Sequence, residues 1–267
     1  MSEIAATHTL TTETTRSTSS IGQAFVMTAR GLRLTSRKLD AMITAIVLPI
    51  ILMLMFVYLF GGAIQTGTDY VTYVVPGVLL LCAGFGASTT AVSVSEDLNG
   101  GIIDRFRSLD IGGLPVLTGQ VAASVARNIV STVLVFGVAF LIGFRPDADA
   151  LGWLEASGIL LLFILAMSWF SAAIGLLAKS AEAANGFTFF VMFLPYASSA
   201  FVPINTMPSW LQGFAHHQPV TPITEAIRGL LLGTPVGDNA WIALLWCGGI
   251  ILASLVLCAA LYRRRTA

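Results

Sequence analysis

Residues 96–114 read EDLNGGIIDRFRSLDIGGL, a short charged stretch between two long apolar runs. Paired glycines at 100–101 and 112–113 mark a turn at each end, because glycine gives the backbone the freedom that turns need. Between them Ile102, Phe106 and Leu109 recur at helical spacing, which predicts one short amphipathic helix with Asn99 as its candidate cap. A helix of about three turns is too short to cross a bilayer. The stretch is therefore predicted to lie at the membrane surface, where it acts as a lever that a partner protein contacts.

The composition of the chain indicates an integral membrane protein. Of its 267 residues 56% are hydrophobic and 10% charged, and the mean hydropathy is +0.84. Soluble domains contain about 25% charged residues. The formal net charge is zero, which gives nucleic-acid binding no electrostatic support. Cys82, Cys247 and Cys258 lie in apolar runs without metal-ligand spacing, so we interpret them as small hydrophobic side chains.

Apolar runs separated by polar links predict six transmembrane helices, because about 20 helical residues cover the hydrocarbon core. The fold class predicted is all-α integral membrane, with residues 41–267 as one six-helix domain. The expected spans are Ala41–Gly61, Val71–Ser95, Pro115–Phe144, Leu154–Ala178, the segment from Asn185 to about Asn205, and Asn239–Leu261. Pro76 and Gly77 predict a kink in the second span.

The segment before the first span divides into two parts. Residues 1–20 are rich in Ser and Thr, which predicts a disordered tail. In residues 21–40 apolar side chains keep helical spacing and Arg and Lys cluster towards the end, which predicts an amphipathic helix in the headgroup layer. The alternative is an ordinary positive flank that only sets orientation.

Lys and Arg residues are distributed unequally between the two sides of the predicted topology. The side that holds the N-terminus carries Arg16, Arg30, Arg33, Arg37, Lys38, Arg105, Arg107, Lys179, Arg263, Arg264 and Arg265. The opposite side carries only Arg145 and Arg228. Because cytoplasmic loops are enriched in Lys and Arg, both termini and residues 96–114 are predicted to be cytoplasmic.

Residues 206–233, before the last span, predict a hairpin of two short helices at the outer surface. Thr206 and Pro208 are typical of one helix start, Thr221 and Pro222 repeat the signal, and Gly233 is typical of a stop. Helices this short and apolar are expected to enter the outer leaflet and return, with their loop covered by protein.

Polar residues elsewhere do not form a recognisable catalytic, nucleotide or metal site. Lys179-Ser180 lacks the glycines of a phosphate-binding loop, and His216-His217 has no third metal ligand in the pattern. Arg127 is the one charge in the interior of a predicted span, away from its ends, and we expect it to snorkel to the cytoplasmic surface. An ion-driven carrier usually needs an intramembrane acid. The energy for any transport is therefore expected to come from elsewhere, and no cofactor or metal is expected in this chain.

Two stretches resemble the type 2 ABC-transporter permeases, most closely the daunorubicin/doxorubicin-resistance-type drug exporter permeases. They are residues 96–127 (EDLNGGIIDRFRSLDIGGLPVLTGQVAASVAR) and residues 207–233 (MPSWLQGFAHHQPVTPITEAIRGLLLG). In the first, the acid, glycine, arginine and glycine usual in the family fall at Glu96, Gly101, Arg105 and Gly119, while Asp110 stands where proline is common. In the second, the pattern falls at Pro219, Glu225 and Arg228.

The resemblance implies a coupling helix on the cytoplasmic side that contacts a separate ABC ATPase subunit. Its implied residues are Glu96, Asp97, Ile102, Asp104, Arg105, Phe106, Arg107 and Leu109. We expect the apolar members to fill an ATPase groove and the charged members to set the docking geometry. Two ATPase copies would bind ATP and Mg²⁺, and a second permease copy or a homologous chain would complete a pathway in the bacterial inner membrane. Glu225 and Arg228, at i and i+3, can pair, and with Pro219 they are predicted to form an outer gate.

The sequence thus predicts the membrane subunit of an ATP-driven exporter of hydrophobic small molecules. Two other functions fit the same residues: an exporter of lipid or glycan, and a receptor or scaffold that transports nothing. An intramembrane enzyme fits less well, because the predicted spans contain no paired acids, Ser/His pair or metal ligands.

Overall fold

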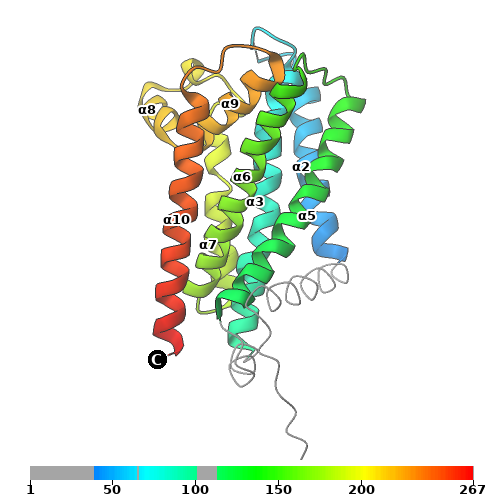
Figure 1. Ribbon diagram of the computed structural model, residues 1–267. Helices are drawn as coiled ribbons and strands as arrows, with labels where there is room; N and C mark the ends of the chain where they lie inside the picture. The colour runs from blue at the N-terminus through cyan, green and yellow to red at the C-terminus, as the bar shows by residue number, and fades with distance from the viewer. Residues whose placement is uncertain (1–38, 65, 101–112, 267) are drawn as a thin grey trace, which may run out of the picture.

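Long helices make up the structure, a computed structural model that describes residues 39–64, 66–100 and 113–266. Four helices are long and apolar enough to cross a bilayer. They are α3 (Tyr70–Asn99), α5 (Gly113–Leu141), α6 (Ala150–Leu177) and α10 (Asn239–Thr266), and they run side by side in one bundle (Figure 1). No strand occurs in the described residues, and the predicted all-α class is confirmed.

The first described helix is α2 (Leu39–Met55), which has 17 residues and continues into the five-residue π-helix η1 (Phe56–Phe60). It packs against α3 and α5. The predicted disordered tail, residues 1–20, and nearly all of the predicted interfacial helix, residues 21–40, lie outside the described residues. Leu39 and Asp40, the last two residues of that prediction, already belong to α2.

Helix α3 is longer than its predicted span. The prediction ended at Ser95, before the first charges, but the helix continues to Asn99, and Gly100 follows as its C-cap. Glu96 and Asp97 therefore lie in the last turn of α3 and not in a separate segment. The prediction followed the run of apolar and small side chains, which ends at Ser95, but the helical backbone hydrogen bonds of α3 continue beyond this run.

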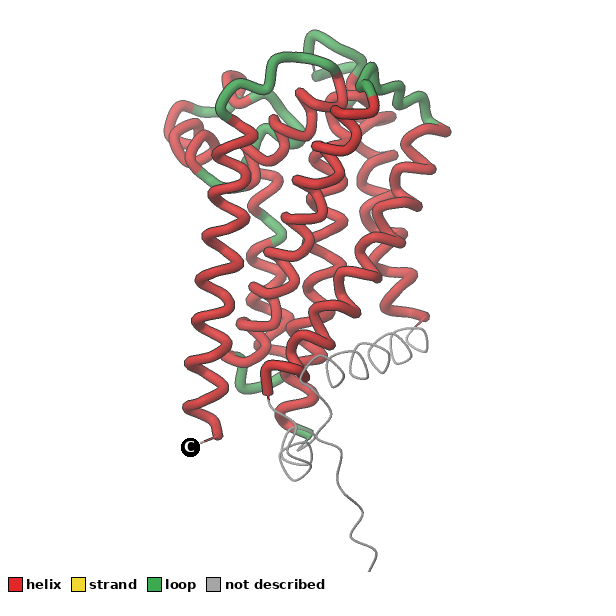
Figure 2. The backbone as a smooth tube through the Cα atoms, in the orientation of Figure 1, coloured by secondary structure: helices red, strands yellow, loops and turns green. Residues whose placement is uncertain are grey.

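The predicted fifth span is not a continuous helix. Helix α7 (Ala181–Val191) has 11 residues, which cover about 16 Å, roughly half of the hydrocarbon core. Turns then lead to the 3₁₀ helices η2 (Leu194–Ala197) and η3 (Ile204–Thr206). Pro195 explains the break, because its ring would clash with the carbonyl of Val191, four residues earlier, and it has no N–H to donate. Figure 2 shows the loop that interrupts the helical path of this segment.

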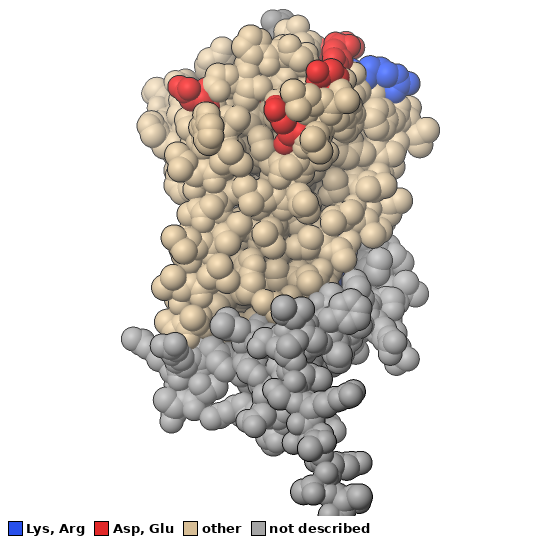
Figure 3. Space-filling view, in the orientation of Figure 1, with Lys and Arg blue, Asp and Glu red and all other residues tan. Residues whose placement is uncertain are grey.

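Two short helices, where the sequence predicted a helical hairpin, close one end of the bundle. We call this end the outer end, because the sequence predicts that it faces outward. They are α8 (Ser209–His217) and α9 (Val220–Leu232), and Gly233 ends α9 with φ +62°. Both predicted start signals are wrong. The Thr206 hydroxyl donates to the Pro203 carbonyl, and the Thr221 hydroxyl donates to the Ala215 carbonyl, so neither caps a helix. On the face seen in Figure 3, the charged side chains of the described residues gather at this outer end.

Helices α3 and α6 pack closely enough to need glycine at their contact. A Cβ placed on Gly175 would lie 2.5 Å from the Ala91 carbonyl oxygen and 2.8 Å from the Val94 Cβ. Small residues allow such close approach between helices in membranes. The same α6 helix carries Gly158, where an added Cβ would meet nothing within 4 Å. These two glycines give a matched pair for testing the packing.

Gly175→Ala is expected to lower the free energy of unfolding by about 2 kcal/mol, because the α3 backbone cannot yield to the new methyl group without the helices moving apart. Gly158→Ala is expected to raise it by a few tenths of a kcal/mol or more, since alanine favours helix over glycine. Unfolding of the purified protein in mixed micelles with a rising fraction of SDS measures both. Equal effects at the two positions would contradict the close packing.

Candidate functional site

Arg228 lies at the centre of the outer end, and its side chain is 8% exposed. Its Nη1 donates to Glu225 Oε1 at 2.6 Å. Nε and Nη2 donate to the Tyr73 carbonyl at 3.1 and 3.0 Å, and Nη2 also donates to the Ser199 carbonyl at 2.8 Å. The guanidinium therefore joins α9 to the start of α3 and to the turn that follows η2.

A proline lies beside this contact on α3. Pro76 lies inside the helix and cannot donate to the Thr72 carbonyl four residues earlier. Proline is tolerated in membrane helices where neighbouring groups satisfy the backbone in that turn. Arg228 donates two hydrogen bonds in the same turn, but to the Tyr73 carbonyl, one residue beyond the carbonyl that proline leaves free.

Two tyrosines of α3 complete this arrangement. The Arg228 guanidinium carbon lies 3.7 Å from the centroid of the Tyr73 ring, a cation–π contact. The Tyr73 hydroxyl donates to the Ser199 carbonyl, and the Tyr70 hydroxyl donates to the Phe201 carbonyl, each at 2.9 Å. We call Tyr70, Tyr73, Ser199, Glu225 and Arg228 the outer clasp. Of these residues, the sequence predicted only the Glu225–Arg228 pair.

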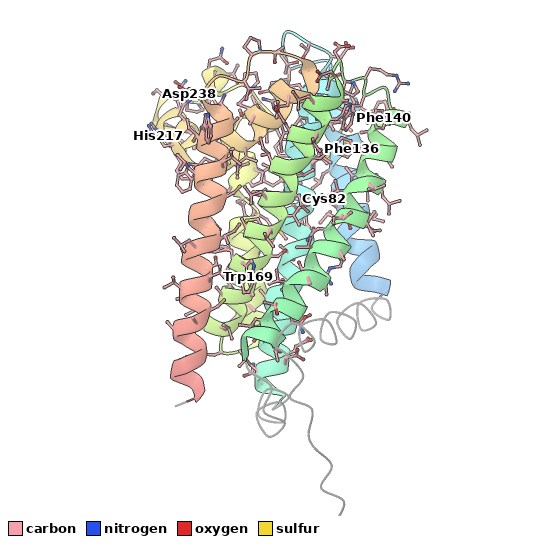
Figure 4. All side chains as sticks on the ribbon, viewed as in Figure 1. Cys82, Phe136, Phe140, Trp169, His217 and Asp238 are labelled. Carbon is pink, nitrogen blue, oxygen red and sulfur yellow. The ribbon has the colours of Figure 1, made fainter. Side chains whose placement is uncertain are left out.

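An open cleft of about 920 Å³ adjoins the clasp on the outer side. Its lining includes Glu225 and Arg228 together with His216, His217 and Trp246. Glu225 is 34% exposed, so the ion pair lies at the wall of a water-accessible space. Figure 4 labels His217 and Asp238 at this end of the bundle. We call this space the outer cleft.

Pro219, the third residue of the predicted gate, lies apart from the ion pair. It precedes α9 and lines a second cavity, of about 210 Å³, on the inner side of the hairpin. This cavity lies between α3, α6, α10 and the break after α7, and all of its lining residues are apolar. We call it the apolar pocket. The predicted gate residues thus divide between two adjacent spaces.

At the opposite end, the structure describes only the two ends of the predicted coupling segment, residues 96–100 and 113–114. Glu96 is exposed in the last turn of α3, and Asp97 accepts a hydrogen bond from Gln120 Nε2 at 2.7 Å, which ties α3 to α5. Asn99, the predicted cap, instead donates weakly to Ser95 Oγ and to the Lys179 carbonyl, both at 3.4 Å. The other predicted coupling residues lie outside the described residues: Ile102, Asp104, Arg105, Phe106, Arg107 and Leu109.

Arg127 was expected to snorkel to the membrane surface, but its guanidinium turns towards α3. Nη2 lies 3.3 Å from Thr90 Oγ1 and 3.4 Å from the Gly86 carbonyl oxygen. One turn away, the hydroxyls of Ser124 and Ser168 lie 3.0 Å apart and link α5 to α6. Polar side chains thus connect three of the long helices in the interior of the bundle.

The ABC-2 type transporter family model matches residues 22–232, a range that contains the predicted coupling segment and the helices α8 and α9. The chain belongs to the ABC-2 type transporter family. It is 32% identical over 228 residues to the daunorubicin resistance ABC transporter permease protein DrrB1 of Streptomyces coeruleorubidus, with 85% of this chain and 81% of that protein covered. This confirms the resemblance on which the sequence prediction relied.

Other permeases match over similar lengths. The probable doxorubicin resistance ABC transporter permease protein DrrC of Mycobacterium tuberculosis is 28% identical over 249 residues, which cover 91% of this chain and 89% of that protein. The inner membrane transport permease YadH of Escherichia coli is 23% identical over 203 residues, 72% of this chain and 77% of that protein. This ABC-2 chain is therefore a multi-pass membrane permease subunit of an ABC transporter, a family that implies an ABC ATPase as its partner.

Proposed function

We propose that this permease exports hydrophobic small molecules, driven by ATP hydrolysis on two copies of a separate ATPase subunit that bind ATP and Mg²⁺. The observation that carries the proposal is the match to a daunorubicin resistance permease along 81% of that protein. A lipid or glycan cargo is the alternative. The apolar pocket favours a small molecule, because about 210 Å³ accommodates one compact group and not an extended glycan.

The proposed topology has six membrane passes. Four are the long helices α3, α5, α6 and α10. We assign the first pass to α2 with η1, and the fifth to α7 with the interrupted segment that follows it. The C-terminal ends of α3, α6 and α10 lie at the same end of the bundle in Figure 1. The segments rich in Lys and Arg follow or include these helix ends in the sequence. The positive-inside bias supports placing this end, and both termini, in the cytoplasm of a bacterium.

Energy is proposed to enter at residues 96–114. Nucleotide-driven closure of the two ATPase subunits would move this segment, and α3 would transmit the motion. Helix α3 supports this role because it connects the two ends of the molecule without interruption, from Glu96 to the outer clasp at Tyr73. A second permease chain, identical or homologous, is proposed to complete the pathway.

ATP-driven uptake into inside-out vesicles tests the proposed function. Vesicles that contain this permease and its ATPase are expected to accumulate daunorubicin, followed by its own fluorescence, and the uncharged dye Nile red. The matched control carries an ATPase that binds ATP but cannot hydrolyse it. If lipid or glycan stimulated ATP hydrolysis while daunorubicin and Nile red did not, the alternative cargo would be favoured.

A further inference from the structure

The apolar pocket exists because two walls lack side chains that would fill it. On one side α7 ends at Val191, and the chain passes the pocket as a turn before Leu194 and Pro195. On the other side α3 presents Gly84, where an added Cβ would meet nothing within 4 Å. Cys82, two residues earlier on α3, is labelled at mid-height of the bundle in Figure 4. The pocket therefore lies at the depth of the hydrocarbon core.

The chemistry of the lining selects for uncharged groups. Phe163 and Met167 of α6 line the pocket together with Met192, and the lining contains no charged side chain. A charged group would lose its hydration there without compensation. Methionine side chains adapt to ligands of different shape. An engineered cavity of about 150 Å³ binds benzene, so 210 Å³ accommodates one aromatic ring system or a branched alkyl group.

The pocket also adjoins the outer cleft. Trp246 lines both spaces. The first turn of α9 divides them, with Pro219 and Val220 on the side of the pocket and Thr221 and Pro222 on the side of the cleft. A molecule held at mid-depth is thus separated from the open outer surface by one indole ring and one helical turn.

We propose that the apolar pocket binds an uncharged aromatic or branched aliphatic group of the cargo, before the cargo passes Trp246 into the outer cleft. Resident lipid is the competing occupant. Cargo is favoured because a lipid tail needs only access from the bilayer, whereas this pocket adjoins a polar cleft of about 920 Å³ that opens outward. The cargo role rests on the proposed function.

Filling the pocket from α3 provides the test. Gly84→Leu adds a side chain at a residue that lines the pocket, and its Cβ would meet nothing within 4 Å. Gly137→Leu is the matched control, because Gly137 is also a helical glycine whose Cβ would meet nothing within 4 Å, but it does not line the pocket. The complex with its ATPase, in liposomes and without ATP, is photolabelled with 3-trifluoromethyl-3-phenyldiazirine, and the labelled residues are mapped by mass spectrometry.

Labelling of Phe163 and Met167, which are 4% and 8% exposed, is measured relative to the lipid-facing Leu252, which is 66% exposed. Gly84→Leu is expected to lower this ratio at least about fivefold, an affinity change of about 1 kcal/mol, and Gly137→Leu is expected to leave it unchanged. An unchanged ratio in Gly84→Leu would overturn binding in the pocket.

The uptake assay then separates cargo from lipid. Gly84→Leu is expected to reduce ATP-driven uptake of Nile red about fivefold relative to Gly137→Leu, with equal amounts of assembled complex. Lost labelling with normal uptake would overturn the cargo role and identify a lipid site. Absence of uptake by the wild-type complex would instead contradict the proposed function, while the labelling ratio would still decide whether the pocket binds an apolar group.

Discussion

Replacing Arg228 with methionine is expected to lower the free energy of unfolding by about 3 kcal/mol, because a buried cation with four hydrogen bonds is lost and its acceptors remain. Methionine keeps the apolar stem of the side chain, so the loss reflects the guanidinium. The carbonyls of Tyr73 and Ser199 would stay buried without these donors, and Glu225 would lose its ion pair. Unfolding in mixed micelles with a rising fraction of SDS measures the change.

Arg145 provides the control for this substitution. It lies at the same end of the bundle and donates to two backbone carbonyls, those of Phe140 and Phe144, at 2.8 Å each. Its side chain is exposed, so water can replace both bonds, and Arg145→Met is expected to change the free energy of unfolding by less than about 0.5 kcal/mol. Equal losses at Arg145 and Arg228 would contradict the clasp.

The clasp also changes what an outer gate would require. The sequence suggested a gate built on a breakable Glu225–Arg228 pair, but breaking that pair leaves Arg228 bonded to two carbonyls. Glu225→Gln alone should therefore reduce ATP-driven uptake much less than Arg228→Gln. If the clasp is a gate, opening it must also release the turn at Ser199 from α3. Normal uptake with both residues changed to glutamine would exclude the gate.

Local patterns predicted the features of this fold that depend on near neighbours in sequence. Apolar runs located the four long helices, the i, i+3 spacing placed Glu225 beside Arg228, and Gly233 marked the end of α9. The break after Val191 also had a local signal. Pro195 forbids the helical hydrogen bond to the Val191 carbonyl. This signal alone was not sufficient to predict the interruption, because Pro76 has the same effect in α3 and that helix continues through it.

The long-range contacts had no comparable signal. Every residue carries a backbone carbonyl, so nothing in the sequence marks Tyr73 as a partner for Arg228, 155 residues away. The same reason explains the misplaced helix starts, because the hydroxyls of Thr206 and Thr221 bond to carbonyls that precede the helices. Pro76 marked only the neighbouring carbonyl of Thr72, which loses its helical donor.

The coupling segment yields the prediction with the largest expected effect. Arg105→Glu, Phe106→Ala and Arg107→Glu together are expected to abolish co-purification of the ATPase subunit. An aromatic anchor at an interface contributes about 2 kcal/mol or more, and two reversed charges add repulsion, so the affinity should fall at least about 100-fold. Lys179→Glu is the control, since it reverses an exposed charge at the same end of the bundle, in the link between α6 and α7.

Cargo-stimulated ATP hydrolysis provides the second readout of this prediction. In the triple variant the permease should still reach the membrane and unfold at the wild-type SDS fraction, because none of the three changed residues belongs to the clasp or to the α3–α6 contact at Gly175. Stimulation by Nile red should nevertheless be lost together with the complex. A triple variant that keeps the ATPase bound and its hydrolysis coupled would show that force does not enter through Arg105, Phe106 and Arg107. The exposed Glu96 at the end of α3 would then be the next coupling residue to test.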